Sequence, residues 1–141
     1  MGEQAVPAYW KLGGTTFVLE ADRAGNWAGH WLNWRTGRFD RRDDRITDVL
    51  LATAEPDIAA LDADEFVWET ESVRSELRGD GEVFALYDTI DAMLDQAGPA
   101  GLGPMETLLI QGLRARTFEL WQIDARRAPG EPSRIRVTGF R

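Results

Sequence analysis

The hydrophobic residues of this chain change their period along the sequence, and this change limits the possible folds more than any other feature. Residues 15–21 and 134–140 place apolar side chains at every second position, as half-buried strands do. Residues 82–97 place them every three or four positions, as on one face of a helix. Strands at both ends with helices between them predict an α+β fold: an antiparallel sheet built from N-terminal and C-terminal strands, with a central block of three to four helices packed on one face.

The N-terminal part predicts a hairpin followed by a short third strand. Turn-forming residues at 23–26 separate the strand at 15–21 from an aromatic run at 27–34. The tryptophan spacing in that run also fits a helix, but the flanking turn residues favour a strand. A third strand is expected to begin at Phe39.

The central and C-terminal parts predict four helices and two further strands. The turn at Gly79-Asp80-Gly81 also suits a hairpin between residues 73–78 and 82–87, and this alternative stays open. A short helix is expected from Asp44 onward and ends before Glu55-Pro56. The other expected helices cover residues 62–78, 82–97 and 104–114, and the expected strands cover residues 117–125 and 134–140.

Length and composition indicate one ordinary globular domain over residues 1–141. The chain has 141 residues, is 43% hydrophobic and contains no cysteine, which excludes disulfides and thiolate metal sites. The lack of cysteine favours a reducing compartment, so we expect a cytoplasmic protein. No stretch approaches the roughly 20 apolar residues of a membrane span, so we expect no membrane partner.

The net charge of −8 is spread unevenly, and its distribution suggests a partner. Residues 55–95 carry 13 acidic residues against Arg74 and Arg78, whereas residues 114–141 carry seven arginines against three acids. A negative surface repels phosphate, so direct nucleic-acid binding is not expected. An acidic helical face instead attracts a basic macromolecule.

We therefore expect a non-enzymatic binding protein, of the inhibitor, immunity or antitoxin kind, that recognises a basic protein partner. This interpretation requires the carboxylates to cluster on neighbouring helices, unpaired with the C-terminal arginines. The expected partner-binding residues are Asp62, Asp64, Glu65, Glu69, Asp88, Asp91 and Asp95.

His30 supports an alternative, because it is the only histidine and lies among tryptophans. In this reading the chain is a small-molecule binder or non-covalent enzyme, with His30 or Glu20 as the acid or base. Ordinary packing explains a single histidine beside aromatic residues better than catalysis does. A third reading is a structural subunit of a larger assembly. The expected pocket residues are Trp27, His30, Trp31, Trp34 and Arg35.

Other chemistry has little material in this sequence. The acidic residues match no calcium loop, so no metal is expected. The glycine-rich stretch at 98–103 follows a helix and lacks the lysine of a phosphate-binding loop, so no cofactor is expected. Three serines and one lysine leave covalent catalysis without its usual groups. The arginines and aspartates between residues 35 and 45 are interleaved, and mutual neutralisation is expected.

Overall fold

The computed structural model describes residues 4–52 and 56–141 and confirms the α+β class, with an antiparallel sheet of five strands, 45% helix and 25% strand. The chain divides into two compact units, Met1–Val73 and Arg74–Arg141. The single domain predicted over residues 1–141 stays a prediction.

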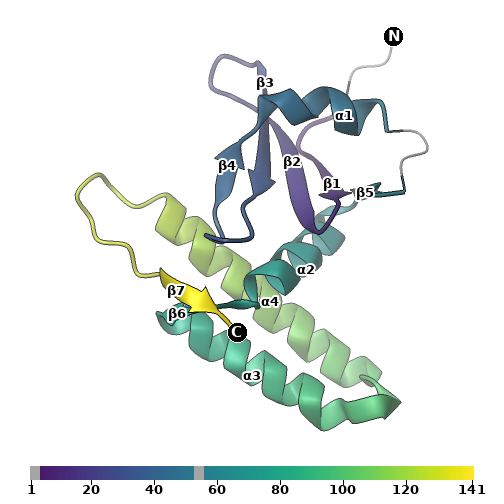
Figure 1. Cartoon of the computed structure of the whole chain (residues 1–141), viewed down its shortest axis with the longest axis vertical. Coiled ribbons are helices and arrows are strands. Elements are labelled where there is room, and N and C mark those ends of the chain that lie inside the picture. The colour runs from purple at the N-terminus through teal and green to yellow at the C-terminus, as the bar shows by residue number, and fades with distance from the viewer. Residues whose placement is uncertain (1–3, 53–55) are drawn as a thin grey trace. The chain divides into compact units, whose positions relative to one another are not determined.

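The first unit is built around the five-stranded sheet, whose order is β4-β3-β2-β1-β5 (Figure 1). All its neighbouring strands run antiparallel. A short 3₁₀ helix, Asp43–Arg45, leads into α1. The elements are β1 (Ala8–Leu12), β2 (Thr15–Ala21), β3 (Trp27–Leu32), β4 (Phe39–Arg41), α1 (Ile46–Leu50), β5 (Ile58–Leu61) and α2 (Ala63–Arg74).

The predicted hairpin is confirmed, and its turn is closed by Asp22. One carboxylate oxygen of Asp22 accepts the backbone N–H groups of Ala24 and Asn26, each at 2.9 Å. Such a side-chain cap satisfies turn groups that no strand partner reaches. The register that follows places Phe17 opposite Trp31. The third strand at Phe39 is also confirmed.

The two faces of this sheet are covered by different helices. On one face, Trp10, Phe17 and Leu19 pack with Val49 of α1 in the buried core. On the other face, Phe66 of α2 stacks on Tyr9 with ring centroids 4.4 Å apart. Successive residues of these strands therefore face different helices, because side chains alternate between the two faces of a sheet.

The start of α2 carries a capping box. Asp62 Oδ1 accepts the N–H of Glu65 at 2.7 Å, and Glu65 Oε1 accepts the N–H of Asp62 at 3.0 Å. This exchange satisfies two backbone donors that the first turn leaves without partners. Asp62 is therefore the residue that caps α2.

The second unit is a helical hairpin with a two-stranded sheet. The helices α3 and α4 run antiparallel side by side (Figure 1). Their buried contact includes a 2.8 Å hydrogen bond from Trp121 Nε1 to the hydroxyl of Tyr87. The elements are β6 (Leu77–Asp80), α3 (Glu82–Ala97), a 3₁₀ turn (Gly98–Ala100), α4 (Pro104–Ala125) and β7 (Arg136–Phe140).

Three expected elements differ from the structure. Residues 117–125 form the second half of α4, not a strand. The helix expected over residues 62–78 ends at Arg74, because Leu77–Asp80 pairs with β7. The C-terminal strand consequently lies in a separate two-stranded sheet with β6. The hairpin alternative is wrong, since residues 82–97 are helical and the strand Leu77–Asp80 pairs with β7.

Candidate functional site

The expected acidic face is divided between the two units. Asp62, Asp64, Glu65 and Glu69 belong to the start and middle of α2 in the first unit, whereas Asp88, Asp91 and Asp95 belong to α3 in the second. The sequence block that contains them is continuous, but β6 interrupts it between the helices. The two sets of acids therefore belong to different units.

Most of the carboxylates in this α2 set already bind groups within the first unit. Asp62 and Glu65 form the capping box, and Glu69 pairs with Lys11 of β1 at 3.5 Å. A carboxylate already bonded to its own unit offers less to a partner, since the existing contact must first be broken. Asp64 is exposed.

The α3 carboxylates lie on a helix that has no basic residue. Glu82, Asp88, Asp91 and Asp95 are its four acids. The side chains of Asp88 and Asp91 are 71% and 41% exposed. The buried side of the same helix carries Val83, Phe84, Tyr87 and Ile90. The acids consequently form the outer face of α3, as their helical spacing predicts.

Arg141 occupies part of this face. Its guanidinium forms ion pairs with Asp88 and with Asp91, and its side chain is 23% exposed. The backbone N–H of Arg141 donates to the carbonyl of Glu76 at 2.8 Å, which fixes the position of Arg141 beside β6. A cavity of about 520 Å³, lined by both aspartates together with Arg78, Gly79 and Phe84, surrounds the pair.

The pairing with Arg141 limits the acidic interpretation, which required carboxylates without arginine partners. The sequence did not indicate this contact, because the aspartates and the arginine are some 50 residues apart. The only available signal was the excess of arginines after residue 114. Four acids against one guanidinium still leave three net negative charges on α3.

His30 does not share a pocket with the tryptophans of its own strand. It lies opposite Val18 in the sheet, while Trp27 and Trp31 alternate with it and face the other side. Glu20 lies on the face of His30 but opposite Ala28, and no hydrogen bond joins the two among the described residues. The Nδ1 atom of His30 is buried and has no hydrogen-bond partner among them.

Two of the expected pocket tryptophans, Trp31 and Trp34, contact arginines at the surface. The guanidinium of Arg42 lies 4.9 Å from the ring centroid of Trp31, and that of Arg35 lies 4.9 Å from the ring of Trp34. Both are cation–π contacts; only Trp34 and Arg35 are neighbours in sequence. Trp27 and Trp34 are 43% and 46% exposed, so they do not enclose a cavity.

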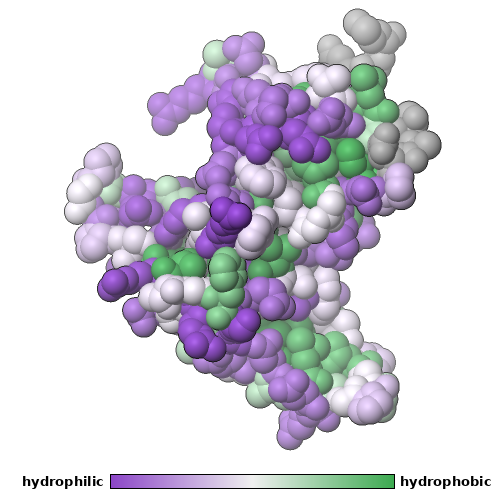
Figure 2. Space-filling view, viewed as in Figure 1, coloured by the Kyte–Doolittle hydropathy of each residue, from purple (hydrophilic) through white to green (hydrophobic). Residues whose placement is uncertain are grey.

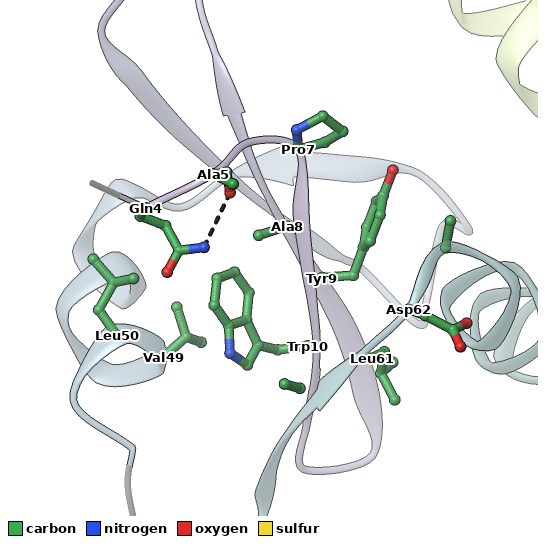
Figure 3. A pocket seen from close by; sticks show the side chains of 12 residues that line it. Gln4, Ala5, Pro7, Ala8, Tyr9, Trp10, Val49, Leu50, Leu61 and Asp62 are labelled. Carbon is green, nitrogen blue, oxygen red and sulfur yellow. Dashed lines mark hydrogen bonds between the residues drawn. The ribbon is translucent and has the colours of Figure 1, made fainter. Parts of the chain in front are cut away.

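The first unit contains a cavity that the sequence did not predict. Its volume is about 520 Å³, and its lining includes none of the expected pocket residues. Figure 3 shows Gln4, Val49, Leu50 and Trp10 gathered around it, and Gln4 Nε2 donates to the carbonyl of Ala5 at 3.0 Å. The carboxylate of Asp62 points away from these residues in the same view. The cavity is lined by polar and apolar surface in nearly equal parts.

The expected neutralisation between residues 35 and 45 is confirmed for two pairs. Arg41 Nε donates to Asp43 at 2.6 Å, and Arg42 Nε donates to Asp44 at 2.9 Å. The hydrogen bond from Arg41, followed by that from the N–H of Gly29, lowers the pKa of Asp43. These arginines and aspartates consequently pair with one another, and the segment offers no concentrated positive charge to an anion.

Comparison with protein-family models, with curated proteins and with solved structures finds no match for this chain. Among residues 4–52 and 56–141, no group of three or more histidine, aspartate or glutamate side chains could hold a metal ion. No helix in those ranges has both the length and the apolar character that crossing a membrane requires. The outer face of α3 is the candidate site that remains.

Proposed function

We propose that the protein binds a basic macromolecular partner through the outer face of α3, as a non-enzymatic inhibitor or immunity protein does. The observation that carries this proposal is the charge of α3: four acids, no basic residue, and a net charge of −3 after pairing with Arg141. Such a face attracts basic partners and accelerates their association. The absence of cysteine supports a cytoplasmic place for this interaction.

Arg141 indicates how a partner would be held. Asp88 and Asp91, one helical turn apart, already accept one guanidinium between them. An arginine of the partner would make the same charge-assisted hydrogen bonds after displacing Arg141. Asp95 makes no ion pair with the described residues and extends the face by one further turn. The proposal therefore favours an arginine-bearing surface on the partner.

Capture from native lysate at low and high salt, followed by mass spectrometry, tests the proposal. We expect one basic protein that is retained at low salt, released at high salt and lost with the variant D88N/D91N/D95N. The variant E20Q/D57N/D64N removes as much charge from exposed positions of the first unit and serves as the matched control. His30→Ala tests the alternative site and is expected to retain the partner.

The variant Arg141→Gln sharpens this test. Removing the guanidinium leaves Asp88 and Asp91 without their internal partner, so we expect tighter retention and release at a higher salt concentration than for the unmodified chain. An empty capture at both salt concentrations contradicts the proposal. Retention that is equal for the unmodified chain and D88N/D91N/D95N contradicts it as well.

A further inference from the structure

The cavity of the first unit has the size and the mixed lining of a small-molecule site. It lies at the start of β1, the end of β5 and α1, and its volume of about 520 Å³ falls within the range of roughly 300–1,000 Å³ that such sites occupy. Val49, Leu50 and Leu61 form part of its apolar wall. Figure 2 shows hydrophobic surface on the first unit in the region of α1 and β5.

The indole N–H of Trp10 is a hydrogen-bond donor that opens onto this cavity. The residue lines the cavity and is only 8% exposed, and its Nε1 atom makes no hydrogen bond with the described residues. This atom is not sealed inside the protein as Nδ1 of His30 is. A tryptophan N–H in a largely buried ring usually has an acceptor. A bound molecule with an acceptor would supply one here.

Gln4 adds an acceptor to the same cavity. Its Nε2 donates to the carbonyl of Ala5 at 3.0 Å, and its Oε1 has no partner among the described residues. Figure 3 shows this oxygen on the same side of the β1 ribbon as the Trp10 ring. One free donor and one free acceptor complement an amide group, which carries both an acceptor and a donor.

No charged group of the lining residues is directed into the cavity. The lining contains no lysine, arginine or histidine, and Asp62 is its only carboxylate. Asp62 accepts the N–H of Glu65 at 2.7 Å, and its carboxylate points away from the cavity in Figure 3. A charged ligand would lose its hydration without gaining an opposite charge, which costs far more than the burial of a neutral polar group. The cavity therefore favours an uncharged ligand.

We propose that this cavity binds a small uncharged molecule that has an apolar body and an amide group. The amide carbonyl accepts the N–H of Trp10, and the amide N–H donates to Oε1 of Gln4. The apolar body packs against Val49 and Leu50 of α1. The site shares no residue with the outer face of α3 and is independent of the partner proposed for that face.

Titration of the isotopically labelled full chain with 2-naphthamide, followed by NMR, tests the proposal. The indole N–H signal of Trp10 is the one that Trp10→Phe removes. We expect 2-naphthamide to move this signal downfield and to saturate, because the N–H gains an acceptor. The other tryptophan N–H signals are expected to move less.

Two alanines of β5 provide a matched pair of variants. Ala60 lies opposite Trp10 in the sheet and lines the cavity, whereas the adjacent Ala59 faces the other side and does not. Both are exposed, so a leucine at either position can be accommodated. We expect Ala60→Leu to fill the cavity and weaken the affinity for 2-naphthamide about tenfold or more, a loss that corresponds to about 1.4 kcal/mol. Ala59→Leu is expected to bind like the unmodified chain.

Charged relatives of the probe test the recognition of the amide. 2-Naphthoate lacks the donor for Gln4, and 2-naphthamidine lacks the acceptor for Trp10, so we expect each to bind about tenfold more weakly than 2-naphthamide or worse. Gln4→Glu introduces a carboxylate that attracts an amidinium. This variant is expected to bind 2-naphthamidine more tightly than the unmodified chain does.

Four results would overturn the proposal. The first is a Trp10 signal that does not move or does not saturate. The second is an Ala60→Leu variant that binds no more weakly than Ala59→Leu. The third is a charged probe that binds the unmodified chain as tightly as 2-naphthamide. The fourth is a Gln4→Glu variant with no gain in affinity for 2-naphthamidine. None of these results depends on the α3 interaction, so the two proposals can fail separately.

Discussion

Gly79 shows how a single residue maintains the contact between β6, β7 and α3. A Cβ at this position would collide with the backbone carbonyl of Arg136 and would lie 2.8 Å from two ring atoms of Phe84. The register of the two strands is also irregular between Arg78 and Gly79. Only glycine leaves room beside the strand for both the Arg136 carbonyl of β7 and the ring of Phe84.

We therefore expect Gly79→Ala to lower the free energy of unfolding by about 1–3 kcal/mol, the usual range for overpacking. Gly139→Ala is the matched control, because a Cβ there would meet nothing within 4 Å although the residue lies on the paired strand. Urea denaturation of both variants measures the difference. Equal stability of the two would contradict this account of Gly79.

Asp43 supports a second prediction at the residue scale, concerning pH. Its folded pKa is lowered, chiefly by Arg41, so the unfolded chain binds the proton more readily. The stabilisation is fully present above the unfolded pKa of about 4 and is lost as pH falls through the folded value. Asp43→Asn should therefore melt at a lower temperature than the unmodified chain at pH 7. Its melting temperature should also fall less on acidification than that of the unmodified chain.

Thermal melts between neutral and acidic pH measure this effect. Asp57→Asn removes an exposed carboxylate of the same unit and serves as the control. A variant Asp43→Asn that follows the same pH dependence as the unmodified chain would show that the Arg41 contact does not stabilise the fold.

The hairpin of α3 and α4 holds together through a polar contact as well as apolar packing. Tyr87 is fully buried and Trp121 is 2% exposed, and the bond between them joins the middle of α3 to the second half of α4. Tyr87→Phe leaves the buried indole N–H without this acceptor. We expect a loss of about 1–3 kcal/mol in the free energy of unfolding, the usual penalty for a buried unsatisfied donor.

Urea denaturation followed by circular dichroism tests this loss. Tyr9→Phe is the control, since the Tyr9 hydroxyl makes no hydrogen bond with the described residues and its ring stacking is kept. A Tyr87→Phe variant as stable as Tyr9→Phe would mean that the hydrogen bond contributes nothing.

At the element scale, the sequence predicted those parts whose signal is local. The hairpin of β2 and β3 and the helix at 82–97 carry their own period and turn residues. The second half of α4 was mistaken for a strand because its buried stripe includes Arg114, Thr117 and Asp124. Because these buried residues are polar, the apolar residues of this segment do not show the helical period. The chance alternation of Phe118 and Leu120 with polar residues indicated a strand instead.

Elements defined by distant pairing could not be predicted in this way. The strand β5 is four residues long and exists because it pairs with β1, and β6 pairs with β7 almost 60 residues further on. The same reason applies to the candidate site. The spacing of Asp88, Asp91 and Asp95 predicted one helical face, but nothing local to α3 indicated that Arg141 would reach it.

For the whole molecule, net charge and charge arrangement suggest different places for a basic partner. The first unit has seven basic and 14 acidic residues, a net charge of −7, whereas the second has nine basic and ten acidic residues, a net charge of −1. In the second unit, however, residues 79–113 contain six acids and no basic residue. Net charge alone favours the first unit, and our proposal favours α3.

Titration of the isotopically labelled full chain with a short oligoarginine peptide, followed by amide NMR shifts, separates these two outcomes. We predict shift changes centred on Asp88, Asp91, Asp95 and Arg141 that disappear on addition of salt. Changes centred on the first unit, including the acids of α2 from Asp62 to Glu69, or no changes at all, would contradict the assignment of partner binding to α3.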